Sequence, residues 1–138
     1  MNIRNILLGT LLGVFTLVVS AHTSERNADP VARHGGLAKR VGEYNIEVVA
    51  QKEQVFLYVH SRGNRALSTD GATASMRLMY DGGSTELSLL PSGSNQLTGD
   101  WQAPPVSRLN AVLNIKMYGH EPVKRLLVGV PLSVEIPE

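Results

Sequence analysis

The sequence predicts an all-β protein, a single antiparallel two-sheet sandwich of immunoglobulin-like size that follows an N-terminal signal peptide. Apolar and polar residues alternate along five clear stretches, which is the period of half-buried strands. Beyond residue 21, no stretch has apolar residues at helical spacing over three turns, and turn sequences recur every eight to fifteen residues. The connections are too short for parallel crossovers, so antiparallel pairing is favoured. A small barrel is the alternative.

The first residues predict export. Arg4 precedes the apolar run Ile6 to Val19, whose fourteen residues suit a signal-peptide core and fall short of the roughly twenty that a spanning helix needs. Val19 and Ala21 are small enough for cleavage after Ala21. We therefore expect a signal peptide at 1–21, a flexible lead-in at 22–35 and the β-sandwich at 36–138. An uncleaved N-terminal anchor remains the alternative, and the periplasm is the simplest destination.

The strands are expected in chain order as follows. The lead-in is polar and contains the helix-opposing pair Asp29-Pro30. Residues 46–50 and 55–60 each alternate and predict two strands. Residues 76–90 predict a hairpin closed by the Gly-rich turn 81–84. Residues 109–117 form the longest alternating series, and we expect them to pair with the last apolar stretch, 123–136.

The alternation also predicts which side chains form the core. Glu47 falls on the face opposite the core, so truncating it to Ala is expected to cost well under about 1 kcal/mol. Met117 continues a core series, and Trp101 is expected to close one end of the sandwich. The predicted core consists of Ile46, Val48, Val55, Leu57, Val59, Leu78, Leu87, Leu89, Leu109, Leu113 and Ile115.

Composition excludes several function classes. The formal charge is +1, so there is no basic surface of the kind that binds nucleic acid, and after signal cleavage no membrane partner is expected either. There are no cysteines, which excludes disulfides, thiolate metal sites and thiol nucleophiles. The motifs of serine hydrolases, nucleotide-binding proteins, zinc proteases and EF-hands are also missing. These observations indicate a protein that is not an enzyme.

Histidine and methionine are the remaining candidates for a metal site. His22 would be the mature N-terminus, where its amine and imidazole can chelate Cu(II) together, although an N-terminal His can also be incidental. His34 precedes two glycines that permit positive φ and close backbone approach, so it is either presented on a turn or simply a turn residue. His120 follows a predicted strand, and His60 ends an aromatic stripe. Met79 falls on the more exposed face of its strand.

Four short motifs resemble a group of small exported β-sandwich domains, which occur alone or at the front of the membrane-fusion adaptors of heavy-metal efflux pumps. The motifs are residues 34–36 (HGG), 42–49 (GEYNIEVV), 55–59 (VFLYV) and 71–74 (GATA). The match spans about residues 34 to 90, with weaker agreement through the last hairpin. This resemblance implies a periplasmic location, the His34 turn and a link to copper or related metals.

We therefore expect a non-enzymatic periplasmic protein that binds a copper-type ion and buffers it or passes it to an efflux system. His34 and His120 are the first ligand candidates, and His22, His60 and Met79 are secondary ones. The expected partner is a heavy-metal efflux adaptor or another envelope protein. The alternative from a different class is an interaction module that docks on an envelope protein and has no metal site.

Overall fold

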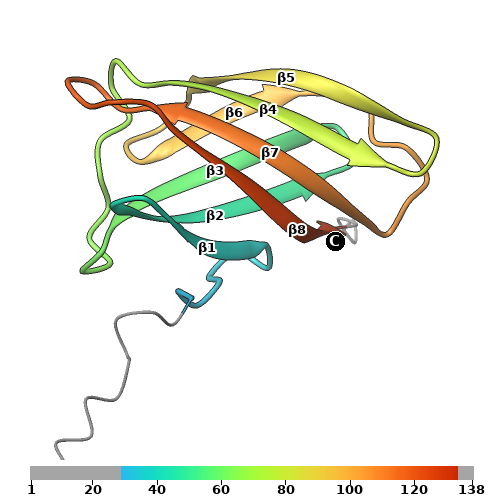
Figure 1. Ribbon diagram of the computed structural model, residues 1–138, viewed down its shortest axis with the longest axis horizontal. Helices are drawn as coiled ribbons and strands as arrows, with labels where there is room; N and C mark the ends of the chain where they lie inside the picture. The colour runs from blue at the N-terminus through green and yellow to red at the C-terminus, as the bar shows by residue number, and fades with distance from the viewer. Residues whose placement is uncertain (1–28, 134–138) are drawn as a thin grey trace, which may run out of the picture.

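The computed structural model describes residues 29–133, which form eight β-strands and no helix (Figure 1). In this part of the chain, no helix is long and apolar enough to cross a membrane. The predicted signal peptide and its cleavage after Ala21 lie outside the described residues. The strands are β1 (Leu37–Val41), β2 (Tyr44–Gln51), β3 (Gln54–Ser61), β4 (Thr73–Tyr80), β5 (Gly83–Pro91), β6 (Gln96–Asp100), β7 (Arg108–Lys116) and β8 (Val123–Ser133).

The sheet closes on itself, so the predicted two-sheet sandwich is wrong and the fold is a seven-stranded barrel. The strand order is β1-β2-β3-β6-β5-β4-β7-β8, and β8 pairs with β2 to complete the ring (Figure 1). Around the ring from β2 to β7 and on to β8, all neighbours are antiparallel. Because seven is an odd number, the last pair must be parallel, and β2 and β8 are indeed parallel.

Two strands bend to change partners, and these bends distinguish the barrel from a sandwich. In β5, Gly83 to Leu89 pair with β4, whereas Leu90 and Pro91 pair with β6. In β8, two residues, Val128 and Gly129, lie opposite the single residue Asn110 of β7, which is a β-bulge. Gly129 has a φ of +75°, and its N–H donates to the Asn110 side chain over 3.0 Å. Beyond this bulge, β8 reaches β2.

The barrel interior holds the predicted core. All eleven side chains predicted from the alternation are buried. The predicted hairpin is confirmed as β4 and β5, joined by Asp81 and Gly82, and the predicted pairing of the last two apolar stretches is confirmed as β7 with β8. Met117 is buried too. Trp101 is buried beside the β2–β3 turn, where its indole N–H donates to the Gln51 carbonyl over 2.7 Å.

Strand β2 is buried on both faces, which the alternation did not predict. Its core face carries Ile46 and Val48, while Asn45, Glu47 and Val49 on its outer face are buried as well. β1 pairs with β2 along Tyr44 to Val48, on the edge that β8 uses further along at Ala50 and Gln51. The segment before β1 lies over the outer face, so the outward position of Glu47 does not expose it to solvent.

Candidate functional site

The two glycines after His34 allow the chain to lie close against β2. Gly35 has a φ of +76°, a conformation that residues with a side chain adopt only with strain. At Gly36 a Cβ atom would stand 2.1 Å from the carbonyl oxygen of Val48 and 2.9 Å from the Val49 side chain. Gly36 therefore permits a backbone approach that no larger residue would allow, and it brings His34 over the outer face of the barrel wall.

The Glu47 carboxylate anchors this segment. Both of its oxygens accept from the backbone N–H of Arg33, at 2.9 and 3.0 Å, and from the backbone N–H of His34, at 2.8 and 2.9 Å. Two successive N–H groups thus converge on one anion, an arrangement that favours the ionised carboxylate. The expected solvent-facing position of Glu47 is wrong, and its contacts argue against the small cost predicted for Glu47→Ala, since these donors would lose their acceptor.

The His34 imidazole is held by two further contacts. Its Nδ1 lies 2.9 Å from Glu47 Oε1, and its ring stacks on Tyr58 at a centroid distance of 3.8 Å and an interplanar angle of 4°. Because a carboxylate can only accept, Nδ1 carries the proton, which leaves the lone pair of the neutral ring on Nε2. The side chain of His34 is 42% exposed, whereas that of Glu47 is 6% exposed.

His60 shares a small cavity with this pair. The cavity has a volume of about 20 Å³ and is lined by His34, Glu47 and His60 together with residues of the lead-in and β2. Burial lowers the pKa of His60, and the neighbouring Arg33 and His34 lower it further, while Glu47 acts in the opposite direction. A space of this size holds one water molecule or one ion and excludes an organic ligand.

A polar network closes the cavity on the side of the loop after β3. Asn45 donates from Nδ2 to the side-chain oxygen of Asn64 over 2.8 Å and accepts from Arg40 Nε over 3.4 Å. Asn64 has a φ of +61°, a left-handed conformation that Asn tolerates better than most residues. These bonds fix the loop against β2, and Asn64 joins the lining of the cavity.

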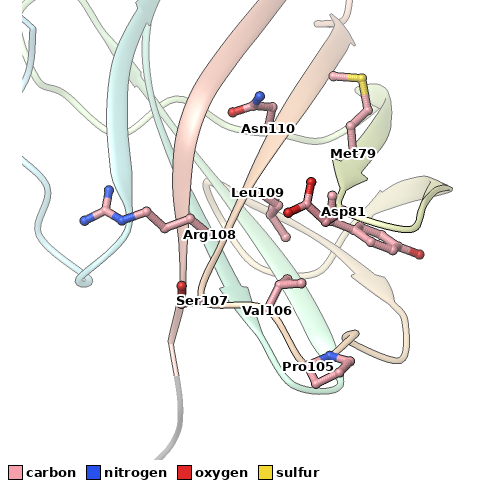
Figure 2. A pocket seen from close by; sticks show the side chains of 9 residues that line it. Met79, Asp81, Pro105, Val106, Ser107, Arg108, Leu109 and Asn110 are labelled. Atoms are coloured by element: carbon pink, nitrogen blue, oxygen red, sulfur yellow. The ribbon is translucent and has the colours of Figure 1, made fainter.

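The structure brings together only two of the five predicted ligand residues. His120 is exposed in the β7–β8 turn, where its ring meets Tyr44 edge to face at 6.4 Å. Met79 lines a different, wider hollow of about 590 Å³, formed with the β4–β5 turn and residues 105–110 (Figure 2). His22 lies outside the described residues. Of the four candidates that the structure describes, only His34 and His60 share a site.

The wider hollow lacks the features of a metal centre. Figure 2 shows Arg108 pointing away from Asp81, and no histidine contributes to the lining. The other polar groups there are Tyr80, Ser107 and Asn110, and the Asn110 side chain is engaged by Gly129. Met79 would thus have no imidazole partner in this hollow.

Periodicity alone does not identify Glu47, which orients the candidate site. One signal was available: Glu47 is the single charge in the strand-forming stretch 44–50, where Val48, Val49 and Ala50 are consecutive apolar residues. Such a run is typical of a strand covered on both faces, and an acid inside it requires partners. Those partners come from thirteen and fourteen residues earlier in the chain, a pairing that periodicity does not reveal.

The site can offer imidazole nitrogen atoms to a metal ion, but its described residues do not form a complete set of metal ligands. Within residues 29–133, no group of three or more His, Asp or Glu side chains is placed to hold a metal ion. His34 and His60 supply two nitrogen donors at most, with Glu47 behind His34 as an orienting carboxylate. Comparisons with protein-family models, curated proteins and solved structures found no match to this chain.

Proposed function

We propose that this chain is a non-enzymatic, exported metal-binding protein that takes a copper-type ion as cargo at His34 and His60. The observation that carries the proposal is the bond between His34 Nδ1 and Glu47, at 2.9 Å. Metal-binding histidines in proteins usually donate their second ring N–H to a carboxylate, which fixes the tautomer and makes the ligating nitrogen more basic. His34 is held in that way, and its Nε2 is free of partners in the described part of the chain.

The size of the cavity and the type of donors narrow the choice of cargo. A cavity of about 20 Å³ suits a single ion. Imidazole binds Cu, Zn and Ni, and Cu(I) is satisfied by as few as two ligands, whereas tetrahedral Zn sites need four. Two imidazoles without thiolates therefore favour Cu(I). The wider role, buffering the ion in the periplasm or passing it to an efflux adaptor, follows from the motif resemblance at residues 34–74.

Calorimetric titration tests the proposal, with Cu(I), Cu(II), Zn(II) and Ni(II) added in parallel. His34→Ala and His60→Ala should each lower Cu(I) affinity about tenfold or more, equivalent to about 1.4 kcal/mol. His120→Ala is the matched control, because His120 is exposed and outside the cavity. Circular dichroism of each variant checks that the sheet is intact. Equal Cu(I) affinity in all three variants, or a loss only with His120→Ala, would refute the site.

Glu47→Gln separates orientation from ligation. The amide keeps one oxygen to accept from the backbone N–H groups, but it can no longer act as an anion beside Nδ1. We expect a smaller loss of Cu(I) affinity than with His34→Ala, and an unchanged number of bound ions. A complete loss of binding in folded Glu47→Gln protein would make Glu47 a ligand instead.

A further inference from the structure

Strand β8 carries an apolar outer surface that nothing in the described part of the chain covers. Leu126 and Val128 are 55% and 63% exposed, while Leu127 between them is buried in the core. Three consecutive apolar residues are typical of a strand that is covered on both faces. β2 has the same pattern at Val48, Val49 and Ala50, and there the outer residue Val49 is 4% exposed. β8 therefore has the apolar pattern of a strand that is buried on both faces, although no described residue covers its outer face.

The strand registers extend this surface across neighbouring strands. Leu126 lies directly opposite Val112 of β7, and Val112 lies opposite Arg77 of β4. In the next row, Lys124 lies opposite Asn114. Residues directly opposite each other share a face of the sheet, so the apolar pair borders a polar and basic area. We call the surface formed by Arg77, Val112, Lys116, Lys124, Leu126 and Val128 the β8 face.

The charge on the β8 face is predominantly positive. Arg77, Lys116 and Lys124 are all exposed, and none of them makes an ion pair with another described residue. Two acids border this face: Glu86 lies opposite Arg77 on β5, and Glu121 lies in the β7–β8 turn between Lys116 and Lys124. Two shallow grooves, of about 360 and 290 Å³, run between these side chains, and Ser75 and Asn114 contribute to both. The grooves offer hydrogen-bonding groups beside unpaired cations.

We infer that the β8 face docks an acidic segment of a partner protein, with Leu126 and Val128 covered by apolar side chains of that segment. Charge complementarity selects this occupant, because complementary potentials steer association and like charges oppose it. A second copy that docked through its own β8 face would place one positively charged surface against another. A lipid surface is disfavoured, since the face exposes two aliphatic side chains only, which give little insertion, and the exposed aromatic residue Tyr118 lies beyond Lys116 in the β7–β8 turn. Grooves lined by Ser and Asn suit polar side chains better than lipid chains.

Site-specific photocrosslinking of the full chain in its native cells tests the inference. The photoreactive residue p-benzoylphenylalanine replaces Val128, and in a control chain it replaces Ser84, which is exposed on β5. We expect one protein adduct at position 128, absent at position 84, in which tandem mass spectrometry maps the bond to a segment rich in Asp, Glu and apolar residues. Lys116→Glu with Lys124→Glu should lower the adduct yield at least tenfold.

The matched charge control is Lys52→Glu, in the exposed β2–β3 turn, which should leave the yield unchanged. Melting curves of all variants ensure that the barrel is intact. An adduct with a second copy of the chain, with lipid or with a basic segment would overturn the inference, as would the absence of any adduct at position 128. The result is independent of metal binding, because the β8 face shares no residue with the cavity at His34.

Discussion

At the scale of single residues, Glu47 connects the stability of the barrel to the geometry of the candidate site. Its carboxylate serves two backbone N–H groups and one imidazole, and it is almost fully buried. A carboxylate so placed cannot be replaced by an apolar side chain without leaving donors unsatisfied. The same residue that holds the lead-in also fixes the tautomer of His34. The carboxylate that fixes this segment on the barrel therefore also orients the His34 imidazole.

Glu47→Ala should therefore destabilise the protein substantially. Loss of the acceptor leaves the N–H groups of Arg33 and His34 without their partner, and an unsatisfied buried donor costs about 1–3 kcal/mol. We expect the free energy of unfolding in urea to fall by about 2 kcal/mol or more. Glu53→Ala, in the exposed β2–β3 turn, is the control and should change it by less than about 0.5 kcal/mol. Similar values for the two variants would mean that the lead-in is not anchored in solution.

His60 should make stability depend on pH in the metal-free protein. Its pKa is below the usual value of 6.5 in the folded state, chiefly because of burial. The unfolded chain therefore binds the proton more readily than the folded chain. The free energy of unfolding should be unaffected by His60 above pH 6.5 and should fall as the pH drops from 6.5 towards the folded-state pKa of His60. His60→Gln should reduce this slope when unfolding is followed between pH 5 and pH 7.5 with a chelator present. An identical slope in the variant would assign the effect to another group.

At the scale of elements, the turn before β1 assigns different roles to two adjacent glycines. Gly35 needs a left-handed conformation but has open space around it, whereas a Cβ at Gly36 would collide with the Val48 backbone. The sequence could predict that this pair allows a special turn, because glycine has that use in general. It could not predict which β-strand the turn approaches. The turn contacts Val48 of β2, which lies twelve residues later in the chain, and local sequence patterns do not reveal such a contact.

Gly36→Ala should thus be far more damaging than Gly35→Ala. At Gly35 the cost is conformational, about 1 kcal/mol, because alanine adopts a positive φ only with strain. At Gly36 the methyl group would have to move β1 away from β2, since a separation of 2.1 Å from Val48 O is impossible. Thermal melts should show a small decrease for Gly35→Ala and a large one for Gly36→Ala. The reverse order would show that β1 lies differently against β2.

At the scale of the whole molecule, alternation predicted six of the eight strands and the residues of the core named above, but it missed β1 and β6 and could not predict closure. Inward and outward positions alternate in the same way in a sandwich and in a barrel, so Leu57 or Leu113 would be buried in either fold. The difference lies in where β5 and β8 change partners. Gly129 was visible as a glycine within an apolar stretch, which is typical of a bulge. Its consequence, contact between β8 and β2, joins residues about eighty positions apart.

Only part of the candidate site could be predicted, because local patterns mark single residues and do not reveal which of them meet in the fold. His34 stood out because of the glycines that follow it, and His60 because it ends an aromatic stripe. Their shared cavity requires the lead-in to fold back over β2 and β3, which local patterns do not encode. The sequence placed His120 beside His34 as a first candidate and Met79 beside His60 as a secondary one. The tertiary structure separates them from the imidazole pair.

The closing pair of the barrel also determines how far apart the two ends of the folded chain are. Leu37 at the start of β1 pairs with Val48, and Leu132 near the end of β8 pairs with Ala50, on the same edge of β2. Val48 and Ala50 are two residues apart in one strand, a distance of about 7 Å.

A short linker could therefore join Ser133 to Leu37, and new termini could open at the exposed Asp81-Gly82 turn. Such a circular permutant keeps every strand pairing and loses only the covalent connection between β4 and β5. It should therefore fold to the same barrel, with a similar circular dichroism spectrum. Because residues 29–36 are absent from it, the permutant should lose Cu(I) binding at His34 while retaining the β8 face.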